Sequence, residues 1–307
     1  MILLKKIIPI LIAVVIIYAI FLFLSDIDKI IDKIINFKLE FVPIIVALVI
    51  FSWFIVYYRW TILLKTLDIK IPHRINFQIF LIGGALGITP GKVGELFKSQ
   101  ILKDKFEIPR TKTAPLFVVE KFLDIVGALI ITSVGIWFVP ELGYVSIIGL
   151  LSLILIFKIL ISKKLFNRIL IFFAKFEIFK KYLEPLSSSH EILTQSLKTK
   201  NFPLLSLLSI LYWIVIGIAA FFVVQGFGIT SISIINMISI YSGSLIVGAL
   251  SFIPGGIGVA ESSLIGLFSL QKIDISEAVI IVVLIRFFTL WLSTIAGFIA
   301  LKTGKIL

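Results

Sequence analysis

Six long apolar stretches decide what this chain can fold into. They cover Ile7–Leu24, Phe41–Leu64, Thr113–Val139, Leu142–Ile161, Phe202–Gln225 and Ile275–Leu301. A helix needs about 20 apolar residues to cross a hydrocarbon core of about 30 Å, and each stretch approaches or exceeds that length. Backbone polar groups in lipid must be satisfied within the protein, which such stretches achieve as helices. We therefore expect an all-α integral membrane protein with about six transmembrane helices.

The composition agrees with this class. Hydrophobic residues make up 60% of the 307 residues and charged residues 15%, whereas soluble domains are about 45 to 50% apolar. The absence of Cys excludes disulfides, thiolate nucleophiles and Cys-based metal sites. Lys5 and Lys6 precede the first stretch and no small-residue cleavage site follows it, which favours a retained helix over a signal peptide. We expect residues 1–307 to form a single membrane domain.

Two further apolar segments, residues 77–102 and 234–270, are interrupted by Pro-Gly sequences. The first contains TPGKVGE (Thr89–Glu95) and the second contains PGGIGVAE (Pro254–Glu261). Proline and glycine interrupt helices, and unwound backbone at membrane depth must be satisfied by protein, water or a ligand. Paired interruptions in the two halves of a chain are typical of the central site of a transporter.

The positions of Lys and Arg predict the orientation of these segments. Basic residues flank the first segment on both sides, at Arg59, Lys65, Lys70, Arg74, Lys98, Lys103, Lys105, Arg110 and Lys112. Residues 201–270 contain neither Lys nor Arg. Because cytoplasmic loops are enriched in both residue types, we expect the flanks of 77–102 inside and those of 234–270 outside. Each segment then leaves and returns on one side, as a re-entrant helical hairpin.

The order of these elements predicts an inverted-topology repeat. Residues 1–140 would contain two spans, the hairpin 77–102 and a third span. Residues 141–301 would contain a span, a basic cytoplasmic segment at 162–200, a second span, the hairpin 234–270 and a last span. This arrangement predicts a multi-pass protein of the cell membrane with both termini in the cytoplasm. The alternative is two unrelated proline kinks in ordinary spans, because Pro and Gly are common in membrane helices.

Several charged residues lie inside or beside apolar sequence, where an ionisable group costs at least about 2.5 kcal/mol. They are Glu95, Glu120, Lys121, Asp124, Glu261 and Arg286. Lys121 and Asp124 are spaced to pair on one helix face, and we expect Arg286 to be the partner of Glu261. The alternatives are a structural ion pair that orients a helix and, for Glu95, a cap at the positive end of a helix dipole.

The first Pro-Gly sequence also predicts an anion-binding site. Thr89 is expected to be a helix N-cap and Pro90 the first helical residue. The amides of Gly91, Lys92 and Val93 would then be free beside the Lys92 ammonium group. Such an arrangement binds anions, and a phosphate or phosphodiester is the expected ligand.

In the second sequence, Gly255, Gly256 and Gly258 would let a ligand approach the backbone closely. The expected substrate-binding residues are Thr89, Pro90, Gly91, Lys92, Gly94, Glu95, Glu120, Lys121, Asp124, Pro254, Gly255, Gly256, Gly258, Glu261 and Arg286.

The basic segment 162–200 contains apolar residues at helical spacing, at Leu165, Phe166, Ile169, Leu170, Phe173 and Phe176. Basic residues occupy other positions, at Arg168, Lys175, Lys180 and Lys181. This pattern indicates an amphipathic helix that faces anionic headgroups; a plain cytoplasmic loop is the alternative. His73 and His190 are expected in separate loops without acidic or Cys neighbours, so neither a metal site nor a cofactor is expected.

Four sequence blocks resemble a known family. The segments TPGKVGELFKSQIL, VVEKFLDIVGAL, FIPGGIGVAESSLIGLF and LIRFFTLWLSTIAG are similar to characteristic blocks of the lysylphosphatidylglycerol synthase transmembrane family, which are flippase-like membrane proteins. In multidomain relatives this region is joined to a cytosolic aminoacyl-transferase domain and is thought to move the charged lipid between leaflets. Other relatives are linked to glycolipid or polyprenyl-linked glycan pathways. The resemblance implies the translocating part without the transferase.

The expected function is therefore flippase-like transport of an anionic lipid or a lipid-linked phosphate or glycan carrier between leaflets. The expected partners are membrane lipids, either an anionic phospholipid or a polyprenyl-phosphate-linked glycan, and no nucleic acid. No enzymatic activity is expected, and the nucleotide-binding sequence GxxxxGK[ST] is absent. Two other classes stay open: a membrane-embedded transferase or phosphatase, and a non-transporting partner that scaffolds a lipid-modifying or glycosylation enzyme. A homo-oligomer is compatible with each.

Overall fold

The computed structural model describes residues 34–174, 183–251 and 253–303, and these residues form helices and no strand. The expected first span, Ile7–Leu24, lies outside the described residues. So do four residues of the expected amphipathic pattern, Lys175, Phe176, Lys180 and Lys181. The all-helical class predicted from the apolar stretches is confirmed for the part of the chain that the structure describes.

Among the described residues, four helical segments are long and apolar enough to cross a membrane. They are η1 and α3 (Leu39–Phe41 and Val42–Lys65), α7 (Leu142–Ile161), α11 (Phe202–Gly226), and the run of α14 (Ile275–Arg286), the π-helix η6 (Phe287–Trp291) and α15 (Leu292–Thr303). Each coincides with a stretch identified by its hydropathy. The expected span at Thr113–Val139 forms α6 (Arg110–Val134), which ends earlier because Gly135–Trp137 forms the short 3₁₀ turn η4.

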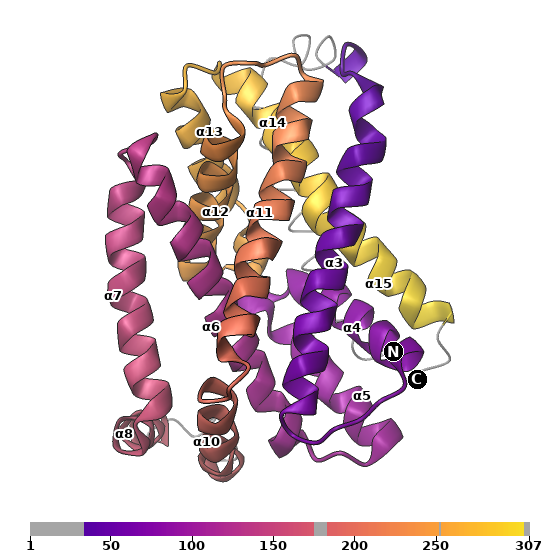
Figure 1. Cartoon of the computed structure of the whole chain (residues 1–307), viewed down its shortest axis with the longest axis vertical. Helices are drawn as coiled ribbons and strands as arrows, with labels where there is room; N and C mark the ends of the chain where they lie inside the picture. Colours follow the sequence, from indigo (N-terminus) through magenta and orange to yellow (C-terminus); the bar gives the residue numbers. More distant parts are fainter. Residues whose placement is uncertain (1–33, 175–182, 252, 304–307) are drawn as a thin grey trace.

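The two Pro-Gly sequences interrupt helices where the sequence predicted. The first unit comprises α4 (His73–Ala85), the 3₁₀ turns η2 (Leu86–Ile88) and η3 (Pro90–Leu96), and α5 (Phe97–Phe106). The second unit comprises α12 (Ile234–Leu250), the turn η5 (Pro254–Gly256) and α13 (Val259–Leu270). In Figure 1 the first unit lies toward the lower end of the molecule and the second toward the upper end, and the turns η3 and η5 contact each other.

Helices from both halves of the chain pack closely. α3 lies beside α11 near the middle of the molecule, and α15 packs on α4 (Figure 1). Gly297 of α15 faces the carbonyl oxygen of Leu81 and the side chain of Ala85, and any side chain at residue 297 would collide with them. An element that follows the second break thus covers the helix that precedes the first.

The described residues of the basic segment 162–200 include the helices α8 (Lys163–Ala174) and α10 (Leu183–Leu197), which lie at one end of the molecule. In α8, Phe166 is buried and Arg168 is exposed, as the amphipathic pattern predicted. The expectation that His73 and His190 lie in loops is wrong. His73 begins α4, and His190 lies within α10. Burial of Leu193 and Leu197 against the core stabilises α10 as a helix.

Candidate functional site

The second break is organised around a buried ion pair. Arg286, at the end of α14, donates from Nε to Glu261 Oε1 at 2.6 Å and from a terminal nitrogen to the carbonyl oxygen of Gly255 at 2.8 Å. The other carboxylate oxygen of Glu261 accepts the backbone N–H of Gly258 at 2.7 Å. Arg286 is 4% exposed and Glu261 is 2% exposed. The predicted pairing of Glu261 with Arg286 is confirmed, and Glu261 also caps the start of α13.

The glycines of this break serve the backbone more than they open it to a ligand. Gly255, Gly256 and Gly258 have φ of 60°, 68° and 86°, and only glycine adopts such angles without strain. A Cβ atom on Gly256 would lie 3.2 Å from the backbone of Gly248. The backbone of Gly248 thus occupies the Cβ side of Gly256, and the close approach of a ligand to these glycines stays a prediction. Nothing lies within 4 Å of a Cβ built on Gly258.

The first break is closed by Thr89. As predicted, Thr89 is the residue before the helical turn and Pro90 is its first residue. The Thr89 hydroxyl donates to the Leu86 carbonyl at 2.8 Å and accepts the Gly94 N–H at 2.6 Å. The Lys92 N–H donates to the carbonyl oxygen of Thr89 at 2.8 Å. The expectation of a free amide at Lys92 is wrong, because the tight 3₁₀ turn uses it.

Beside this break lies a chain of alternating charges. Lys121 Nζ is 2.9 Å from Glu95 Oε1 and 3.3 Å from Asp124 Oδ2, which confirms the predicted pair of Lys121 with Asp124. The other oxygen of Asp124 is 2.7 Å from a terminal nitrogen of Arg59. Arg59 also donates to the hydroxyl of Ser209 on α11 at 2.7 Å. One network therefore joins α3, α6, α11 and the first break.

A second ion pair joins the first unit to α6, and it is buried more deeply than the pair of Lys121 with Glu95. Lys98 Nζ of α5 is 2.7 Å from Glu120 Oε2 of α6. The same ammonium group lies 4.0 Å from the centre of the Trp60 ring, at a distance that favours a cation–π interaction. Lys98 is 3% exposed and Glu120 is 2% exposed. Burial of this kind requires a partner for each charge, and each has one.

Sequence reasoning treated Arg59 and Lys98 as flanking charges that orient the chain, and this interpretation is wrong. Arg59 is 1% exposed and both residues form ion pairs inside the molecule. The sequence does contain a signal that both residues are buried. Arg59 is followed in the same helix by the apolar run Ile62–Leu64, and Lys98 lies within the apolar segment 77–102.

Four buried or partly buried cations are thus matched by four carboxylates. The pairs are Arg59 with Asp124, Lys98 with Glu120, Lys121 with Glu95, and Arg286 with Glu261. Lys92 differs from these four cations. Its side chain is exposed, and within the described ranges it takes part in none of the ion pairs.

The two histidines do not extend this site. His190 is 8% exposed and its ring packs against Phe166 with centroids 4.8 Å apart. Burial, together with the charge of nearby Lys163, lowers the pKa of His190 below its usual value, so the ring is neutral at pH 7. Across the described residues, no group of three or more His, Cys, Asp or Glu side chains could hold a metal ion.

The fold and these contacts define a multi-pass helical membrane protein with two interrupted helical units that meet at their breaks. Residues 10–297 match the family model described as the lysylphosphatidylglycerol synthase TM region. The chain belongs to this family, and the resemblance drawn from its four sequence blocks is confirmed. No curated protein matches the chain.

Proposed function

We propose that this chain is a flippase-like transporter that moves an anionic lipid, or a lipid-linked phosphate or glycan carrier, between leaflets of the cell membrane. One observation carries the proposal: the turns η3 and η5 contact each other, and each break has a glutamate–cation pair beside it. Paired helix interruptions that meet are typical of a transporter's central site.

The proposal includes a topology of six spans, two re-entrant hairpins and an inverted repeat of residues 1–140 and 141–301, with both termini in the cytoplasm. The ion pairs support the repeat. Glu95 pairs with a cation 26 residues later, Lys121, and Glu261 pairs with a cation 25 residues later, Arg286. In each half the cation belongs to the next membrane helix, α6 or α14.

In this proposal a headgroup phosphate replaces a carboxylate as the partner of a buried cation, instead of binding to an already free cation. Removing one partner of a buried ion pair costs about 3 to 5 kcal/mol, so Arg286 is accessible to a phosphate only as the phosphate takes over from Glu261. Exposed Lys92 would meet the phosphate first, beside the break formed by Thr89, Pro90, Gly91 and Gly94. The lipid chains stay in the bilayer during this exchange, and Glu120 and Asp124 hold the remaining cations.

The proposal contains no catalytic step, and each buried carboxylate acts in it as a counter-ion. Lipid translocation in proteoliposomes that contain only this protein tests it. The probe is a fluorescent phosphatidylglycerol, and the measurement is the rate at which an impermeant quencher gains access to the second leaflet. The protein should accelerate this rate. No acceleration over empty liposomes would favour a scaffold for a lipid-modifying enzyme.

Arg286 provides the specific test. Arg286→Ala should reduce the translocation rate by more than about tenfold, and Arg286→Lys should restore it only in part, because a point charge does not reproduce the two-pronged grip of a guanidinium group. Lys302→Ala, at an exposed residue of α15, is the control and should transport normally. Normal transport by Arg286→Ala would show that Arg286 is only a structural charge.

A further inference from the structure

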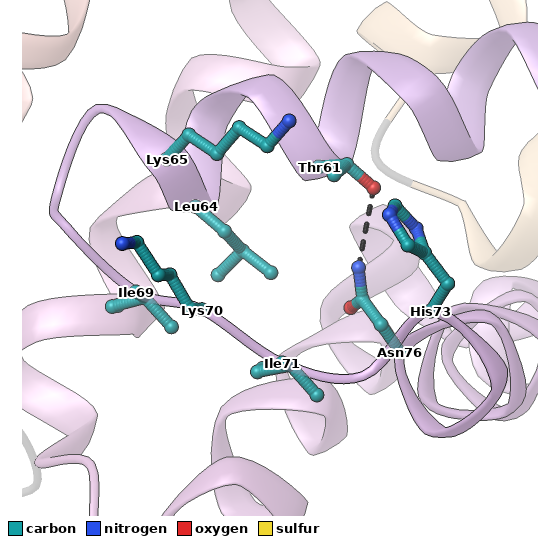
Figure 2. Close-up of a pocket in the computed structure, with 8 residues that line it drawn as sticks. All are labelled: Thr61, Leu64, Lys65, Ile69, Lys70, Ile71, His73 and Asn76. Carbon is teal, nitrogen blue, oxygen red and sulfur yellow. Dashed lines mark hydrogen bonds between the residues drawn. The ribbon is translucent and has the colours of Figure 1, made fainter.

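A pocket of about 170 Å³ lies where α3 ends and α4 begins. Three segments form it: the end of α3, the connection at residues 69–71 and the first turn of α4. Its lining residues are Thr61, Leu64, Lys65, Ile69, Lys70, Ile71, His73 and Asn76 (Figure 2). None of them belongs to either break, so this pocket is separate from the site proposed for transport.

The pocket combines basic and apolar side chains. Figure 2 shows Lys65, Lys70 and His73 around the side chain of Leu64, and no acidic residue lines the pocket. Lys65 and Lys70 are exposed, and in the part of the chain that the structure describes neither ammonium group is in an ion pair. The pocket therefore offers a ligand two positive charges that are outside these ion pairs.

The polar wall of the pocket is held in place by hydrogen bonds. Asn76 is 2% exposed; its oxygen accepts the ring N–H of Trp60 at 3.0 Å and its amide nitrogen donates to the Thr61 hydroxyl at 3.2 Å. The dashed line in Figure 2 marks the second of these bonds. The His73 ring is 2.9 Å from the Tyr57 hydroxyl. These contacts fix the shape of the pocket before any ligand binds, which lowers the entropic cost of binding.

We propose that this pocket binds the phosphate group of a membrane lipid. Lys65 is the last residue of the apolar segment Leu39–Lys65, so its ammonium group lies where a spanning helix leaves the hydrocarbon and meets the headgroups. A lipid phosphate reaches the pocket at that depth, and the upper parts of its chains can contact Ile71, which is half-buried. The site holds whether or not the protein moves lipid between leaflets, because it shares no residue with the breaks.

The absence of Cys from the chain allows a direct test in detergent solution. Ile71→Cys places one thiol in the pocket, and its rate of reaction with a maleimide reports occupancy. Short-chain phosphatidylglycerol should slow this reaction severalfold, whereas equal concentrations of inorganic phosphate or short-chain diacylglycerol should not. Equal protection by inorganic phosphate would overturn the lipid assignment, and equal protection by diacylglycerol would overturn the role of phosphate.

Lysine variants complete the test. In the Ile71→Cys background, Lys65→Gln with Lys70→Gln should weaken the affinity for phosphatidylglycerol by about tenfold or more, because each basic residue near a charged lipid contributes on the order of a several-fold gain. The matched control is Lys103→Gln with Lys200→Gln, two exposed lysines outside the pocket, which should keep the full protection. Unchanged protection in the pocket variant would overturn the proposal.

A second measurement, thermal unfolding of the Cys-free chain, tests lipid binding without the introduced cysteine. In the Cys-free chain, phosphatidylglycerol should raise the midpoint of thermal unfolding, and Lys65→Gln with Lys70→Gln should remove that rise. If both binding readouts fail while lipid translocation is normal, the pocket proposal fails and the transport proposal stands.

Discussion

Lys92 combines a left-handed backbone conformation with an exposed side chain. Its φ is 56°, and this conformation costs a non-glycine residue about 1 to 2 kcal/mol. The other described non-glycine residues with positive φ are Asp68, Glu107 and Lys272, which lie just after the ends of helices. Strain inside a packed break persists only where the surroundings enforce it, and such positions cluster at functional sites.

Replacing Lys92 by glycine should separate stability from function. Lys92→Gly removes strain, offset in part by the greater freedom of glycine in the unfolded chain, so thermal stability in detergent should stay equal or rise by up to about 1 kcal/mol. Lipid translocation should fall by about tenfold, because the charge proposed to meet the phosphate first is lost. Glu107→Gly relieves the same strain outside the break and should transport normally. Normal transport by Lys92→Gly would remove this lysine from the site.

Only part of the charged site was predictable from sequence. Glu261 and Arg286 stand out because each interrupts a long apolar run. Between these two residues the sequence contains one other basic residue, Lys272. Arg59 and Lys98 were not identified, since a basic residue near the end of an apolar run is also the usual signal of orientation. Whether such a residue turns inward depends on a partner brought by the fold, here Asp124 or Glu120.

At the scale of elements, the contact of α15 with α4 ties the two halves together. Gly297 lies against the backbone of Leu81 and the side chain of Ala85. Gly297→Ala should push the two helices apart and lower thermal stability by about 1 to 3 kcal/mol, as overpacking does elsewhere. Gly266→Ala is the control, because nothing lies within 4 Å of a Cβ there and alanine favours the helix. Equal stability of both variants, measured by thermal unfolding in detergent, would contradict this packing.

The sequence predicted elements better than their contacts. Long apolar runs identify α3, α7 and α11, because hydropathy depends on local composition alone. The helix α10 was missed, since its polar run at Ser187–Ser189 resembles a loop and its apolar face is short. Local sequence does not encode the contact of η3 with η5, because the two turns lie far apart in the chain.

For the whole molecule, the proposed inverted repeat predicts which surfaces face the cytoplasm. In the Cys-free chain, single cysteines at Lys70 and Lys105 should react with an impermeant maleimide only from the cytoplasmic side. Cysteines at Ser231 and Lys272 should react only from outside. All four residues are exposed, so access is limited only by the membrane. Reaction of Lys70→Cys and Lys105→Cys from opposite sides would make the first unit a kinked span and remove the repeat.

The match of four cations with four carboxylates also has an electrical consequence. A group of charges that sums to zero experiences no net force from the membrane voltage, so that voltage neither pulls these eight side chains together to one side nor holds them there. In the proposed transport, the work done by the field therefore falls on the charge of the lipid, about 2.3 kcal/mol per elementary charge for each 100 mV. For an anionic lipid, an inside-negative voltage therefore favours the outward direction of crossing.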